Sequence, residues 1–265
     1  MVDYKVITLE RHGLKHWLNY SNYTFAAGDA LCPLVIQELP KAVLAMPIGF
    51  IAEGEHFVPV AVQGLEVGQN LLVALDGRWL VSYVPALYRG YPFHLATMEA
   101  GGQVLCIDEA SGLMSESIGE PFFNADGTPG AAVLGILEFF NQIEANRQLT
   151  RSICAVLQQH GLIQSWPLTV QGEQGEQRIE GLFRIDEAAL NGLDADALIE
   201  VRNSGGLTMA YCQLLSMQHM SILGTLAQTH ASARKSLGED SLSKNDGLNA
   251  EFMNESGTFN FGNLS

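Results

Sequence analysis

The stretch that decides the fold is Thr128–Gly161, TPGAAVLGILEFFNQIEANRQLTRSICAVLQQHG. Apolar residues recur along it at helical spacing, with one slip near its middle, and this pattern predicts the longest helix of the chain. Thr128 is the expected N-cap, Pro129 the first helical residue, and Gly161 the residue that ends the helix. Because Thr150 is able to begin a second helix, the pattern allows either one long helix or two.

The sequence before this stretch contains short β-rich segments separated by glycine-containing turns, a pattern that is typical of antiparallel strands. The segment 57–62 contains Pro59, which cannot donate to a strand ladder, and this predicts an edge strand. A hairpin is expected to close at Gly101-Gly102. The expected strands of this half are residues 34–38, 42–51, 57–62, 70–75, 94–98 and 104–108.

The sequence after the stretch contains two strand-like segments and then mainly helical patterns. Asp186 and Asp194 each follow an apolar residue and precede another at N4, which predicts two capped helices. A last helix is expected over residues 207–226. The change from β-like to helical patterns near Gly130 predicts an α+β fold, with an antiparallel strand-rich N-terminal half and a helix-rich C-terminal half. The two strand-like segments are residues 168–170 and 179–184.

The chain is expected to form a single α+β domain over residues 1–229, followed by a disordered acidic tail over residues 230–265. The tail is rich in Ser, Asn, Gly, Glu and Lys and has too few apolar residues to offset the entropy of ordering. Its tip carries Phe252, Phe259 and Phe261. An apolar segment on a flexible tether favours docking, either on its own domain near residues 76–96 or on a partner or second copy.

Composition limits the function classes. The 265 residues include 29 acidic and 14 basic ones, and the formal net charge of −15 argues against nucleic acid or an anionic membrane surface as the main partner. The longest apolar runs are too short to span a bilayer, and charged residues interrupt the N-terminus early, so a cytoplasmic protein without a membrane span is expected. The four widely spaced cysteines are interpreted as reduced core residues.

No recognisable catalytic motif stands in the sequence, so we expect neither a cofactor nor a metal and lean away from an enzyme. His12 and His16 are four residues apart, but no third ligand is spaced nearby, and surface or interface histidines are expected. Asp108 and Glu109 end a predicted strand. Acidic pairs can perform acid–base work, but here we expect both side chains to face water.

The segment 76–96, DGRWLVSYVPALYRGYPFHLA, concentrates aromatic residues around Arg89. Aromatic rings offer apolar area with a polar handle, and Arg binds carboxylate or phosphate bidentately. The segment is therefore interpreted either as a pocket wall or docking site, or as a mixed core, and we expect Arg89 to be buried and paired. The predicted binding residues are Trp79, Tyr83, Tyr88, Arg89, Tyr91, Phe93 and His94.

This segment resembles the hallmark of the SapC family, named after a bacterial S-layer locus and distinct from the peptide-transporter permeases that share the name. The matching residues run from Trp79 through Tyr83-Val84-Pro85 and Arg89 to Tyr91-Pro92-Phe93. Three further segments are similar to family patterns: residues 181–187, 210–217 and 252–261. In the last of these, Asn260 and Gly262 stand where the family pattern has acidic residues.

The resemblance implies an accessory role without an established activity. Family genes commonly accompany TonB-dependent receptors, flavin-dependent halogenase-like proteins and cupin- or JmjC-like proteins, which suggests service in nutrient uptake or in peptide or small-molecule modification. The expected function is therefore a cytoplasmic binding or accessory protein with a protein or peptide partner, such as these halogenase-like or cupin/JmjC-like neighbours. The alternative is an enzyme that modifies a peptide or a small carboxylate-bearing metabolite, with Arg89 as anchor and Tyr83, Tyr88 or His94 near the chemistry.

Overall fold

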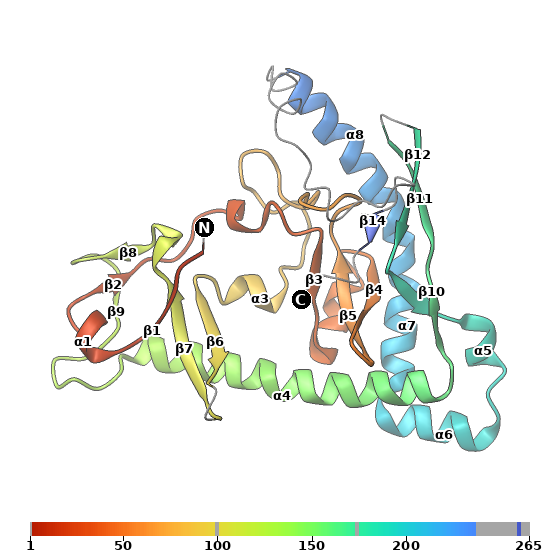
Figure 1. The fold of residues 1–265 in the computed structure, drawn as a ribbon, viewed down its shortest axis with the longest axis horizontal. Helices are drawn as coiled ribbons and strands as arrows, with labels where there is room; N and C mark the ends of the chain where they lie inside the picture. The colour runs from red at the N-terminus through yellow and green to blue at the C-terminus, as the bar shows by residue number, and fades with distance from the viewer. Residues whose placement is uncertain (1, 99–100, 173–174, 237–258, 261–265) are drawn as a thin grey trace. The chain divides into compact units, whose positions relative to one another are not determined.

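The computed structural model describes residues 2–98, 101–172, 175–236 and 259–260 (Figure 1). Its described residues divide into two compact units. Unit 1 comprises Met1–Asn22 and Ala86–Asn146, and unit 2 comprises Tyr23–Pro85 and Arg147–Ser265. The expectation of one folding domain over residues 1–229 stays a prediction.

Unit 1 contains two small antiparallel sheets. The first has the order β1-β7-β6 and includes the hairpin predicted around Gly101-Gly102. The second has the order β8-β2-β9. The elements are β1 Tyr4–Val6, α1 Leu9–His12, β2 His16–Trp17, α3 Ala86–Arg89, β6 Phe93–Thr97, β7 Gln103–Asp108, a 3-10 turn at Glu109–Ser111, β8 Met114–Ser115 and β9 Glu120–Pro121.

The core of unit 1 is aromatic. Phe122 is fully buried, and the ring of Trp17 meets that of Phe93 edge-on at 4.8 Å between centroids. Aromatic pairs at such distances contribute beyond the area that they bury. The core cluster consists of Trp17, Phe93, Leu105, Ile107, Phe122, Val133 and Phe140.

Unit 2 is built on a five-stranded antiparallel sheet with the order β10-β13-β4-β5-β3. A second sheet has the order β11-β12-β14. The strands are β3 Leu31–Pro33, β4 Ile48–Glu53, β5 His56–Val62, β10 Ile163–Ser165, β11 Leu168–Gly172, β12 Gly175–Glu180, β13 Phe183–Ile185 and β14 Phe259–Asn260. Around them lie 3-10 turns at Thr24–Ala26 and Ile36–Glu38, α2 Leu39–Ala42, α5 Glu187–Asn191, α6 Ala195–Ser204, α7 Gly206–Ser216, a 3-10 turn at Met217–His219 and α8 Met220–Ser236.

Helix α7 supplies hydrogen bonds where the central sheet of unit 2 is weakly paired. Strands β13 and β4 share a single residue pair, Phe183 with Phe50. The buried side chain of Gln213 accepts from the Ile185 N–H at 2.9 Å and donates to the Ile48 carbonyl at 3.1 Å. Because buried backbone groups need partners, one amide here replaces two missing ladder bonds.

Several of the expected strands are wrong in whole or in part. Residues 34–38 contain the 3-10 turn Ile36–Glu38 instead of a strand, and of residues 42–51 only those from Ile48 onward are strand. Strand β5 pairs with both β4 and β3, so it is an interior strand and the edge prediction from Pro59 is wrong. The Pro59 carbonyl accepts from the Leu34 N–H just beyond the end of β3. The N–H and C=O groups of one residue point to the same side of a strand. The side on which Pro59 lacks an N–H therefore faces the residue after β3, and the missing donor costs the sheet no hydrogen bond. Residues 70–75 form turns and one bridge instead of a strand.

The long helix is confirmed as one element, α4, Ala131–Gln159, so the alternative of two helices is wrong. Gly161 ends it with φ +64°, and the Gly161 and Leu162 N–H groups donate to the Gln158 and Leu157 carbonyls. The predicted start at Thr128 is wrong. The Gly130 N–H donates to the Phe122 carbonyl and Pro129 forms a bridge with Phe123, so the helix begins only at Ala131.

The capped helices of the C-terminal half are confirmed. The Asp186 carboxylate accepts from the Ala189 N–H, and the Asp194 carboxylate accepts from the Ala197 N–H. The last predicted helix, residues 207–226, is instead two helices, α7 and α8, separated by a 3-10 turn. Helix α8 continues to Ser236, beyond the predicted boundary at residue 229.

The predicted tail lies mostly outside the described residues, including Phe252 and Phe261. The exception is β14, whose backbone pairs in parallel with β12, Phe259 opposite Ile179. This pairing places a piece of the tail on its own chain at β12. Docking against residues 76–96, or on a partner, stays a prediction.

Candidate functional site

The predicted binding segment, residues 76–96, falls on both units. Residues up to Pro85 belong to unit 2, and residues from Ala86 belong to unit 1. The two parts of the segment therefore lie in two different local environments.

In unit 2, Trp79 and Tyr83 form an ordered polar and aromatic cluster. The indole Nε1 of Trp79 donates to the Tyr83 carbonyl at 2.8 Å, and its ring lies 5.3 Å from that of Tyr23. The Tyr83 hydroxyl donates to the buried carboxylate of Glu38 at 2.9 Å. Glu38 also accepts from the Val35 N–H at 2.9 Å. These contacts hold the backbone of residues 79–83, where the chain leaves the loop of residues 74–80.

In unit 1, Tyr88 and Phe93 are buried side chains, and Phe93 belongs to the aromatic core. Tyr91 is half-buried with its ring 6.1 Å from that of Tyr20, and burial raises the pKa of its hydroxyl. His94 is exposed and stacks on Tyr4 at 4.9 Å. The structure thus divides these residues between core packing and the surface.

The prediction that Arg89 is buried is wrong, because the side chain is exposed. Its guanidinium lies over the Phe139 ring, 5.4 Å from the centroid. The reason is the packing of the next residue. A Cβ on Gly90 would stand 2.5 Å from the Phe140 ring, so the backbone side of this turn faces the core and Arg89 points outward.

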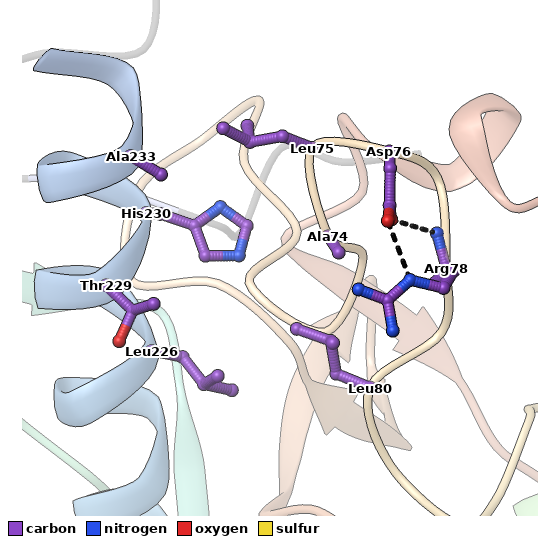
Figure 2. A pocket seen from close by; sticks show the side chains of 9 residues that line it. All are labelled: Ala74, Leu75, Asp76, Arg78, Leu80, Leu226, Thr229, His230 and Ala233. Atoms are coloured by element: carbon purple, nitrogen blue, oxygen red, sulfur yellow. Dashed lines mark hydrogen bonds and ion pairs between the residues drawn. The ribbon is translucent and has the colours of Figure 1, made fainter. Parts of the chain in front are cut away.

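An open, mainly apolar pocket of about 350 Å³ lies in unit 2 between residues 74–80 and helix α8 (Figure 2). Leu75 and Leu80 contribute exposed apolar surface, whereas His230 from α8 is buried. Its lining residues are Ala74, Leu75, Asp76, Arg78, Leu80, Leu226, Thr229, His230 and Ala233. This pocket includes the beginning of the predicted binding segment.

A buried amide supports the loop wall of the pocket. The side chain of Asn70 donates to the Ala26 carbonyl at 3.0 Å and to the Gln63 side chain at 3.1 Å, and it accepts from the Leu72 N–H at 2.9 Å. A bridge between Val73 and Trp79 then closes the loop. Asn70 therefore holds the loop wall from residues that do not line the pocket.

The predicted turn at Asp76-Gly77 is confirmed, with φ +84° at Gly77. The Ala74 N–H donates to the Arg78 carbonyl at 2.8 Å. Arg78 Nε lies 2.6 Å from the Asp76 carboxylate, and this hydrogen bond lowers the pKa of Asp76. Figure 2 shows this exposed ion pair at the rim of the pocket, beside Leu75 and Leu80. The pocket thus offers an apolar interior with one polar, charge-compensated edge.

Sequence reasoning missed this site because its second wall comes from residues 226–233, at the predicted domain boundary. The sequence contained one signal, the repeat of Leu226, His230 and Ala233 at helical spacing. Helix α8 extends this apolar face beyond residue 229. The polar composition of the residues that follow instead predicted a disordered tail from residue 230.

A second missed cluster lies in unit 1. His12 is fully buried, so the expectation of a surface or interface histidine is wrong for this residue. Its Nδ1 accepts from the Thr8 N–H and its Nε2 lies 3.2 Å from Glu109, which Arg11 also binds through two contacts of 2.6 Å. Asp108 is buried as well and caps the Asp3 and Ala110 N–H groups. The expectation that both acidic residues face water is therefore wrong.

The charges of this cluster make unit 1 sensitive to acid. Hydrogen bonds from Arg11 lower the pKa of Glu109 from 4.5 to about 2, and burial lowers the pKa of His12. Glu109 therefore binds a proton more readily in the unfolded chain than in the folded one. Its contribution to stability is complete above pH 4.5 and is lost as the pH falls toward 2.

We expect the free energy of unfolding to fall by about 2 kcal/mol through this group between pH 5 and pH 2, allowing for solvent screening of the half-exposed Arg11. Urea denaturation at a series of pH values measures this loss. Glu109→Gln should reduce the slope of the free energy of unfolding against pH below pH 4.5. Glu10→Gln, a change at an exposed residue nearby in the sequence, should leave this slope unaltered. Identical slopes for Glu109→Gln and the unaltered protein would contradict the assignment.

All four cysteines belong to the described part of the chain and are thiols rather than disulfides. Cys32, Cys106 and Cys154 are buried and Cys212 is half-buried, and burial raises the pKa of Cys154 to about 12. Within the part of the chain that the structure describes, no three His, Cys, Asp or Glu side chains are grouped to hold a metal ion. None of the described helices has the length and apolar content to cross a bilayer.

Comparison with known proteins gives one match. The SapC family model matches residues 7–223, which include the segment 76–96 and most of both units. No curated protein and no solved structure matches the chain. Since the match covers most of its length, the chain belongs to the SapC family.

Proposed function

We propose that this SapC-family protein is a binding or accessory protein that holds a protein or peptide partner by an apolar side chain in the pocket of Figure 2. The observation that carries the proposal is the pocket itself, with a largely apolar lining and two partly exposed leucines, Leu75 and Leu80, at its edge. Apolar pockets with a few polar groups at the rim are the usual form of recognition sites.

The rim adds orientation to this apolar contact. Asp76 and Arg78 form an exposed pair, so their remaining donor and acceptor positions are available to the backbone of an incoming peptide. Tyr83 and Trp79 support the loop from behind without lining the pocket. The roles that we propose for these residues of the segment are therefore contact for Arg78 and support for Trp79 and Tyr83.

The setting that we propose follows the family resemblance. The compartment is the cytoplasm, and the process is TonB-linked nutrient uptake or the modification of a peptide or small molecule, with halogenase-like or cupin/JmjC-like proteins as partners. The excess of acidic residues, 29 against 14, favours a partner with a basic or neutral contact surface. The alternative, an enzyme anchored by Arg89, gains no support because Arg89 is exposed over Phe139 and does not line the pocket.

Site-specific photo-crosslinking in the native host tests the proposal. A photoreactive phenylalanine analogue replaces Leu80 at the pocket edge or Leu198 on helix α6 as the control, two leucines with similar exposed fractions of 39% and 42%. Position 80 should give a discrete adduct whose partner peptide carries an apolar residue at the crosslink. No adduct at position 80, or equal adducts at both positions, would contradict the pocket as the docking site.

A further inference from the structure

Unit 2 has a second cavity, of about 480 Å³. Its lining is more polar than that of the pocket in Figure 2. Strands β10 and β13 place Gln164 directly opposite Arg184 on one of its walls. Helix α5 and the end of α7 supply the rest. The lining residues are Gln164, Arg184, Ile185, Asp186, Glu187, Ala188, Asn191, Leu214 and Met217.

Arg184 is the unusual residue of this cavity. Its Nε atom is buried and has no hydrogen-bond partner among the described residues. A buried polar atom normally has a partner, because leaving it without one costs about 1–3 kcal/mol or more for a charged group. The neighbouring Ile185 is buried in the core, and alternation along β13 turns Arg184 to the opposite face. Arg184 lines the cavity, and its Nε donor is not used by any described residue.

Acidic and apolar groups border the same space. One oxygen of Asp186 caps the Ala189 N–H, and Glu187 is exposed at the cavity. Leu214 and Met217, from α7 and the turn after it, add apolar surface. Two carboxylates beside one guanidinium disfavour a multiply charged anion such as phosphate. They suit a ligand that carries one negative and one positive charge.

We infer that this cavity binds a small zwitterion with an apolar side chain, that is, a free α-amino acid. The carboxylate of the ligand pairs with Arg184, its ammonium group faces Asp186 and Glu187, and its side chain contacts Leu214 and Met217. A guanidinium fork matches a carboxylate bidentately, which explains why an arginine occupies this position. The volume lies in the range of small-molecule sites. This site is separate from the pocket proposed for partner binding, and neither proposal depends on the other.

Calorimetric titration of the full-length protein tests the ligand class with matched probes. Leucine carries both charges, isocaproate lacks the ammonium group, and isoamylamine lacks the carboxylate. Leucine should bind more tightly than either analogue. Methionine and phenylalanine serve as further apolar amino acids. If none of the three amino acids binds at concentrations up to about 10 mM, or if isoamylamine equals leucine, the inference is overturned.

Variants identify the residues. Arg184→Met should lower the affinity for leucine and isocaproate by about tenfold or more without changing the affinity for isoamylamine. Glu187→Gln should lower the affinity for leucine but not for isocaproate. Arg202→Met, on an exposed position of α6, is the control and should bind all probes normally. Arg184→Met should also keep or raise the melting temperature, because it removes a buried atom without a partner. A lower melting temperature with unchanged leucine affinity would make Arg184 a structural residue and overturn the site.

Discussion

Asn70→Ala is expected to lower the free energy of unfolding by about 2–4 kcal/mol and the melting temperature by roughly 5–15 °C. The Asn70 side chain is buried and makes three hydrogen bonds, to Ala26, Gln63 and Leu72. Its removal leaves these groups in the interior without that partner. Since the same amide supports residues 74–80, the loop wall of the partner pocket should also loosen.

Two measurements separate these effects. Urea denaturation gives the loss of stability, and amide hydrogen exchange reports the loop, where exchange over residues 71–80 should increase more than in strand β5. Asn203→Ala, an exposed change on helix α6 in the same unit, is the control and should alter neither. A uniform increase in exchange throughout unit 2 would show that Asn70 has no special part in holding the pocket wall.

Phe122→Ala should destabilise unit 1 by about 3–5 kcal/mol, because it opens a cavity in the aromatic core. Phe122 is fully buried, and its ring lies 5.1 Å from His12 and 6.3 Å from Phe93. Phe122→Leu keeps most of the volume and should cost distinctly less. Differential scanning calorimetry measures both variants.

The same experiment examines the domain organisation. If residues 1–229 fold as one cooperative domain, as the sequence suggests, Phe122→Ala should shift a single transition. Two transitions, of which only one moves, would mean that the two units unfold independently. A loss for Phe122→Ala no larger than that for Phe122→Leu would contradict the role assigned to this ring in the core.

Local signals in the sequence were sufficient for much of the fold. Helical spacing predicted α4, and the side chains of Asp186 and Asp194 cap helices where their spacing indicated. Gly161 and Gly101-Gly102 marked a helix end and a hairpin. In each case, residues close in sequence determine the structure, so the pattern carries the information. The SapC resemblance likewise rested on contiguous motifs and is confirmed.

The wrong predictions concern residues whose environment depends on contacts with residues distant in the sequence. Pro59 lies in an interior strand because β3 ends beside it, and no pattern within residues 57–62 reveals that end. Arg89 is exposed because Gly90 packs on Phe140, far along the chain. His12 is buried through Glu109 and Phe122. Sequence spacing cannot supply such contacts.

None of the seven predicted binding residues lines the pocket, and their part in binding stays a prediction. The segment 76–96 was recognised as special, and its beginning lines the pocket, but the prediction gathered seven aromatic and polar residues into one patch. The structure distributes them between two units and uses Tyr88 and Phe93 as buried residues. The second wall, from α8, and the cavity at Arg184 depend on tertiary packing alone.

We propose that the pocket between residues 74–80 and α8 holds an apolar side chain of a partner. The test of this docking is the affinity of pocket variants for the partner peptide that crosslinks to position 80. Calorimetry or interferometry measures this affinity. Ala233→Trp fills the pocket, and Ala231→Trp makes the same change on an exposed position of the same helix. If the partner docks in this pocket, Ala233→Trp should weaken binding by about tenfold or more, whereas Ala231→Trp should bind normally. Equal affinities for the two variants would contradict this docking.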